Sequence, residues 1–169
     1  MGAGALKVSG AAAALMEGDF SYNVSDWKPE VGYDVSGDAG ELRIEQGNSE
    51  GVRLGGDARN EWDLRSNDEV PTDLVVEMGA GEGDLNLDSL TLTELDLEMG
   101  AGEATVDLTG DYAQGFDTSI EGEVGEATVL VPSEVSVRVR AERGLGKINA
   151  EGFRRGDKPT STTPMAIRR

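Results

Sequence analysis

Glutamates recur at matching positions along this chain, and pairs of carboxylates can carry out two kinds of chemistry. Glu77 and Glu98 lie 21 residues apart, as do Glu82 and Glu103, and Glu126 follows in a similar phrase. Two carboxylates about 5–10 Å apart can hydrolyse a glycosidic bond. Clustered carboxylates can also bind Ca²⁺, which takes about six to eight oxygen ligands. These five glutamates are therefore the candidate metal ligands of the sequence.

The repetition of these glutamates argues against catalysis. An active site is a unique group of residues in a cleft, whereas acids that return with every repeat are typical of a solvated face. The sequence contains no His and no Cys, which excludes imidazole acid–base catalysis, thiol nucleophiles and Cys/His zinc sites. It also lacks an EF-hand or Gly-rich nonapeptide calcium motif. We therefore expect no catalytic residues and no cofactor, with calcium binding as the alternative use of the glutamates.

The phrase Met-Gly-Ala-Gly-Glu occurs at Met78 and again at Met99, and superficially resembles a phosphate-binding loop. A phosphate loop needs a helix N-terminus behind it and usually a lysine. Here alternating strand-like residues follow the phrase and acids surround it, so phosphate binding is rejected. With 33 acidic against 15 basic residues, the formal charge of −18 also predicts no binding to nucleic acid or to anionic membrane surfaces.

The glycine phrases recur at near-constant intervals, which indicates an internal repeat. Gly81, Gly102, Gly125 and Gly146 are separated by 21, 23 and 21 residues. The same spacing leads backwards to Asn60 and then to Gly40, and a weaker first copy is expected near Ala12. Asn is the residue other than Gly that best tolerates a positive φ. We expect these landmark residues where the chain reverses direction: Gly40, Asn60, Gly81, Gly102, Gly125 and Gly146.

Each period of about 21 residues also predicts two short strands. Residues 94–99, for example, place Leu95, Leu97 and Met99 on one face and three acids on the other. Such a unit cannot bury its apolar face alone, so successive units must stack. The predicted fold is all-β, a repetitive β-solenoid-like stack of two-strand rungs. The alternative is an antiparallel β-sandwich built from the same strands.

The domain organisation follows from where the repeat is regular. Residues 1–155 are expected to form one repetitive β domain, with regular rungs over 38–152 and a less regular part over 1–37. Residues 156–169 are basic and do not alternate, which predicts a disordered tail. Trp27, Tyr33 and Trp62 are expected to cover the open end or an edge of the stack. Unpaired strands at its ends predict a homodimer, or covering by the tail.

No apolar run approaches the roughly 18 residues of a membrane span, so we expect no direct membrane insertion by this chain. A native anchor or signal segment is expected to lie outside this sequence.

With its repeats at residues 78–87 and 99–108, the chain resembles the toast-rack domains over about residues 3–155. This family includes the domain of unknown function of LiaF-type cell-wall-active-antibiotic response proteins and related adhesin-like proteins. The resemblance implies a non-catalytic, extracytoplasmic or cell-surface scaffold whose partner is a protein or another envelope component. The LiaF type resembles a negative regulator in envelope-stress sensing, but this chain lacks the membrane helices of that type.

Two alternative functions are also compatible with the sequence. One is an adhesin or glycan-binding module, and the other is a calcium-stabilised surface protein. A glycan binder should present exposed aromatic rings along one face, whereas this chain has only two Trp, three Tyr and three Phe, mostly outside the regular repeat.

Overall fold

The computed structural model of the chain describes residues 1–47, 58–112, 115–131, 138–151 and 165–167. Apart from the short 3-10 helix η1 (Ser25–Trp27), the regular elements of this part of the chain are all β-strands, as the alternating residues predict. Their bounds are β1 Ala3–Ser9, β2 Met16–Tyr22, β3 Pro29–Ser36, β4 Ala39–Gln46, β5 Asn60–Ser66, β6 Thr72–Asn86, β7 Leu92–Asp107, β8 Asp117–Leu130, β9 Arg138–Glu151 and β10 Met165–Ile167.

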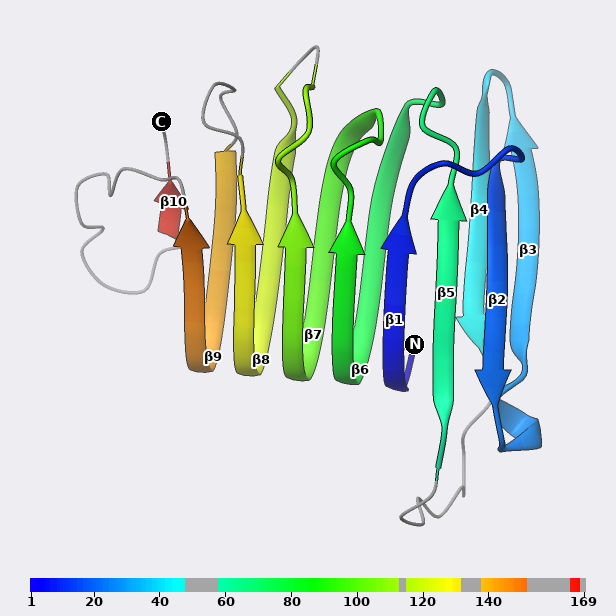
Figure 1. Ribbon diagram of the computed structural model, residues 1–169, viewed down its shortest axis with the longest axis horizontal. Coiled ribbons are helices and arrows are strands. Elements are labelled where there is room, and N and C mark those ends of the chain that lie inside the picture. Colours follow the sequence, from blue (N-terminus) through cyan, green and yellow to red (C-terminus); the bar gives the residue numbers. More distant parts are fainter. Residues whose placement is uncertain (48–57, 113–114, 132–137, 152–164, 168–169) are drawn as a thin grey trace.

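The long strands β6, β7, β8 and β9 are each bent into a U, and these four bent strands are the rungs of the molecule (Figure 1). One limb runs down the rear layer, the chain reverses at the lower edge, and the second limb returns in the front layer. The two short strands predicted in each period are therefore the two limbs of one continuous strand. Inward residues of both limbs, such as Val76, Met78 and Leu85 of β6, are buried.

Neighbouring rungs pair in parallel along their whole length. Gly81 lies beside Gly102, and Glu77 lies beside Glu98. This pairing excludes the antiparallel sandwich for β6 to β9. The order of the described strands runs from β10 at one end to β2 at the other, so this sheet is open and does not close into a solenoid. It is also mixed, because β2 and β10 pair antiparallel with their neighbours.

The core is a narrow aliphatic layer between the two limbs of the rungs. Leucine and valine dominate it because side chains from facing limbs must interdigitate in a limited space. At the β5 end, Trp62 packs edge-on against Phe20, with ring centroids 5.4 Å apart. The largest side chains with almost no exposure are Leu85, Leu87, Leu95, Leu97, Leu108, Val106 and Val129.

The N-terminal strand β1 lies between β5 and β6, although both follow it far along the chain. Gly4 pairs with Gly81, so the first copy of the glycine phrase is Met1-Gly2-Ala3-Gly4. The prediction of a first copy near Ala12 is therefore wrong. Ala12 lies in the connection between β1 and β2, where it is buried.

Strands β3 and β4 form a separate two-stranded antiparallel sheet, so residues 39–46 are not a rung. Gly40 pairs with Val35 inside this hairpin, and it is absent from the described residues that have a positive φ. Its prediction as a landmark at a rung reversal is wrong. The phrase around it resembles the repeat only because any half-exposed strand alternates apolar and polar residues.

The C-terminal tail was predicted to be disordered, and this is wrong for Met165–Ile167. These residues form β10, which pairs antiparallel with residues 139–141 of β9 and covers that edge. The remaining residues of 156–169 lie outside the described part. No helix within the described residues is long and apolar enough to cross a membrane.

Candidate binding surface at the glycine bends

The landmark glycines form a column along the lower edge of the rack. Gly4, Gly81, Gly102 and Gly125 have φ values of 142°, 134°, 134° and 141°, where a side chain would be strained. They are also packed backbone to backbone: a Cβ on Gly102 would lie 1.9 Å from the carbonyl oxygen of Gly81. Glycine is thus required at each bend both for its dihedral angle and for its lack of a side chain.

The last two landmark positions behave differently. Gly146 pairs with Gly125 and continues the column into β9. Asn60 begins β5 and packs beside Gly4, but among described residues other than Gly only Ala11 has a positive φ, so the predicted reason for Asn is wrong.

Asn60, which is itself buried, instead holds three polar groups of neighbouring strands together. Its side-chain amide donates to the carbonyl of Ala3 (2.8 Å) and to Oε1 of Gln46 (3.0 Å). Its Oδ1 accepts a hydrogen bond from the indole N–H of Trp62 (2.9 Å). The side chain therefore joins β1, β4 and β5 at the lower edge.

A row of apolar residues follows the glycine column on the outside of the bends. The pairing aligns one residue from each strand, and the side chains grow along the row. Val124 is 52% exposed and Leu145 is 75% exposed. We call this row the bend ridge; its members are Ala3, Ala80, Ala101, Val124 and Leu145.

Two rows of glutamates flank the bend ridge, one on each limb. The first acidic row lies on the rear limbs and consists of Glu77, Glu98 and Glu121, with Glu142 next in register. The second acidic row lies on the front limbs and consists of Glu82, Glu103 and Glu126, with Lys147 next in register. Neighbouring members of a row stand about 4.8 Å apart at the backbone, so like charges lie directly opposite each other.

The five glutamates predicted as metal ligands are thus divided between the two rows. Glu77 and Glu98 are neighbours on one limb, while Glu82, Glu103 and Glu126 are neighbours on the other. Over the described residues, no group of three or more acidic side chains is arranged to hold a metal ion. What the rows provide is a strip of negative charge along the outer face of the bends.

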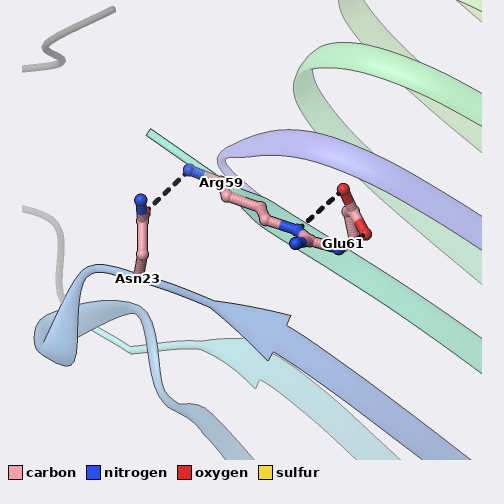
Figure 2. Close-up of polar contacts among 3 residues, drawn as sticks. All are labelled: Asn23, Arg59 and Glu61. Carbon is pink, nitrogen blue, oxygen red and sulfur yellow. Dashed lines mark hydrogen bonds and ion pairs between the residues drawn. The ribbon is translucent and has the colours of Figure 1, made fainter. Parts of the chain in front are cut away.

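Towards the N-terminal end, the second row meets a compensating cation. Glu61, which pairs with Ala5, is bound by the guanidinium of Arg59 through contacts of 3.0 and 2.8 Å (Figure 2). This hydrogen-bonded pair lowers the pKa of Glu61 and raises that of Arg59. The backbone N–H of Arg59 donates to Oδ1 of Asn23 (2.8 Å), which ties the end of β2 to β5.

The β3–β4 hairpin presents a second kind of surface. A hollow of about 270 Å³ on this hairpin is lined mainly by charged residues, together with Val31 and Gly32: Glu30, Asp34, Glu41, Arg43 and Glu45. Arg43 is paired with Glu41, and this hydrogen bond raises the pKa of the guanidinium. One face of the hairpin exposes Val31 (61%), Tyr33 (55%) and Val35 (66%).

The three aromatic residues expected to cover an edge of the stack have different positions. Trp27 and Trp62 are each only 3% exposed, and Trp62 belongs to the core. Tyr33 lies on the exposed apolar face of the hairpin. The alternation of Val31, Tyr33 and Val35 was the sequence feature that could have identified this strand.

Tyr112 closes the core at the edge opposite the bends. Its hydroxyl donates to the carbonyl of Leu87 (2.8 Å), and its ring packs edge-on against Phe116 at 4.7 Å. Burial raises the pKa of this tyrosine well above its ordinary value, and the nearby charges of Asp88 and Asp107 add to the effect. It is a structural residue, because its hydroxyl is already used within the core.

The fold and this surface define a repetitive all-β domain that presents an outer edge rather than a cleft. The family model described as "N-terminal domain of toast_rack, DUF2154" matches residues 1–130. The chain therefore belongs to the toast-rack family.

A solved structure from Clostridium sporogenes ATCC 15579, described as a putative cell adhesion protein, is similar to the chain with a TM-score of 0.85. The two are 31% identical, and the alignment covers 88% of each chain. No curated protein sequence matches the chain.

Proposed function

We propose that this chain is a non-catalytic, adhesin-like binding module displayed outside the cytoplasm, at the cell surface. Its partner is a protein or another envelope component that carries positive charge. The proposal is supported by the family and by the similarity to a structure described as a putative cell adhesion protein. It is also supported by the acidic rows, which repeat with the rungs and so resemble a contact surface more than a reaction centre.

The bend ridge carries the proposal. Val124 and Leu145 are large apolar side chains that remain more than half exposed. Glutamates of both acidic rows, Glu121 and Glu126, flank the position of Val124, whereas Lys147 follows the second row beside Leu145. Apolar residues grouped on a surface and rimmed by polar groups are typical of interaction sites. Flanking carboxylates favour a basic partner, because complementary charge increases the association rate and excludes acidic competitors.

The test compares binding of the chain to isolated cell envelope before and after the ridge is made polar. We expect Val124→Ser combined with Leu145→Ser to reduce binding, and higher salt to weaken the binding of the unaltered chain. Val75→Ser is the matched control, because Val75 is 64% exposed on the outer face of β6 and lies outside the ridge. Equal binding by the ridge variant and the control would refute the proposed surface.

A further inference from the structure

Among the described strands, the first limb of β6 has a neighbour on only one of its two backbone edges in the rear layer. On one side, residues 72–78 pair with β7. On the other side, β1 pairs only with residues 80–85, and within the described part of the chain no strand pairs with residues 72–77. In Figure 1, β1 accordingly has a front limb only, whereas β6 to β9 have two.

Backbone hydrogen bonds identify which groups of β6 face this side. The carbonyl of Glu77 accepts a hydrogen bond from the amino group of Met1, and the N–H of Gly79 donates to the carbonyl of Met1 (2.9 Å). Alternate residues of a strand direct their N–H and C=O groups to the same side. The backbone groups of Asp73 and Val75 therefore also face the free side.

On the far side of this edge lies β4. The N–H of Gly2 donates to the side-chain oxygen of Gln46 at the end of β4 (2.8 Å), and the carbonyl of Met1 accepts from Gly79 of β6, so Met1 and Gly2 connect the lower end of β6's first limb to β4. Above this point Leu74 of β6 and Ile44 of β4 pack against the core but are only partly buried. Met1 is partly buried in the same way, whereas its repeat equivalents Met78 and Met99 are buried.

We propose that the edge at residues 72–77 of β6 is an acceptor site for one further β-strand, parallel to β6 and continuous with Met1. This strand would complete the rung of β1 and cover Leu74 and Ile44. It would also lie between β6 and β4 and so join the two-stranded sheet to the rear layer. The recognition is by backbone hydrogen bonding at a sheet edge, with alternate apolar side chains entering the core. The inference does not depend on the proposed adhesive function.

The repeat specifies which sequence fits the site. Leu95 and Leu97 of β7 lie beside Leu74 and Val76, and Met99 lies beside Met78. Since Met1 occupies the position of Met99, a copy of residues 93–98 placed directly before Met1 carries its leucines in register with the core. A Gly-Ser repeat of the same length is the matched control.

The experiment is hydrogen–deuterium exchange of residues 72–77 in the full chain carrying each extension, together with thermal unfolding. We expect the copied limb to slow exchange there by about fivefold or more, and to raise the Tm relative to the Gly-Ser control. Replacing both leucines of the extension by Ser should remove the gain in Tm. Equal exchange with the two extensions would overturn the proposal.

Protection of residues 72–77 in the unextended chain, appearing together with a dimer mass in light scattering, would also overturn it. That result would assign the edge to a second copy of the chain.

Discussion

At the scale of single residues, the glycine column contains the positions that tolerate substitution least. Gly102 has a φ of 134°, and an added Cβ would lie 1.9 Å from the carbonyl oxygen of Gly81. We expect Gly102→Ala to lower the free energy of unfolding by at least about 3 kcal/mol, because strain and a backbone clash combine. Urea denaturation monitored by circular dichroism measures the change.

Gly122→Ala is the control for the glycine column. Gly122 is aligned with Met99 in the same sheet, and an added Cβ there would meet nothing within 4 Å. Its effect should stay within about 0.5 kcal/mol. Equal losses for the two alanine variants would show that the column has no special role.

Tyr112 makes stability depend on alkaline pH. Its pKa is raised in the folded chain, mainly by burial, from an ordinary value of 10.0. Above about pH 10 the unfolded chain loses the phenolic proton while the folded chain keeps it, so the folded state binds more protons and stability falls as pH rises. Below pH 10 both states are protonated and this contribution is fully present.

We therefore expect Tyr112→Phe to be less stable near neutral pH by about 1 kcal/mol, since the hydrogen bond to the carbonyl of Leu87 is lost. Its Tm should decline less steeply than that of the unaltered chain above pH 10. Parallel slopes of Tm against pH in this range would contradict the assignment.

At the scale of elements, the parallel register that forms the rungs also places like charges opposite one another. Glu98 lies between Glu77 and Glu121 in the first acidic row. We expect Glu98→Gln to stabilise the chain by about 0.2–1 kcal/mol at low salt, and the gain to vanish near 1 M NaCl, where charges are screened. Glu69→Gln, at an exposed site outside the rows, should show no such salt-dependent gain.

The same measurement tests the calcium alternative. If the rows are only repulsive, CaCl₂ and NaCl at equal ionic strength should raise the Tm equally. A larger rise with CaCl₂ would support the sequence-based prediction of calcium ligands.

The elements that could be predicted from the sequence are those specified by local patterns. Alternation identified both limbs of the rungs, and glycine spacing aligned Gly81, Gly102, Gly125 and Gly146, because both features repeat within about 21 residues. The position of β1 could not be read in this way. Its insertion between β5 and β6 depends on contacts more than 50 residues apart in sequence, such as the pairing of Ala5 with Glu61. The identical phrases Met1–Gly4 and Met78–Gly81 do indicate this pairing, but the interval of about 21 residues between the other glycine phrases does not lead to it.

The candidate surface was predictable in part for the same reason. The glutamates occupy equivalent repeat positions, so their rows follow from the register. The bend ridge was not predicted, because its members Ala101, Val124 and Leu145 differ in size and lie beside the glycines, outside the alternating segments. Only the pairing of the strands shows that they are aligned.

At the scale of the whole molecule, the two ends of the sheet differ. The edge of β9 is covered by β10 over residues 139–141, whereas β2 is the last strand at the other end. Exposed strand edges favour association, and charge opposes it. We therefore expect the formal charge of −18 to keep copies of this chain apart at low ionic strength, although none of the described strands pairs with the outer edge of β2.

This balance predicts salt-dependent self-association through β2. The N–H of Asn23 donates to the carbonyl of Arg59 across the pair with β5, so by alternation the N–H of Tyr22 faces away from β5. We expect a monomer at low ionic strength and a reversible dimer near 1 M NaCl, where repulsion is screened. Tyr22→Pro removes a donor from the free edge without removing one from the ladder with β5, and it should abolish the dimer. Light scattering measures the mass, and circular dichroism checks that the variant is folded. A folded Tyr22→Pro variant that still dimerises would place the contact elsewhere.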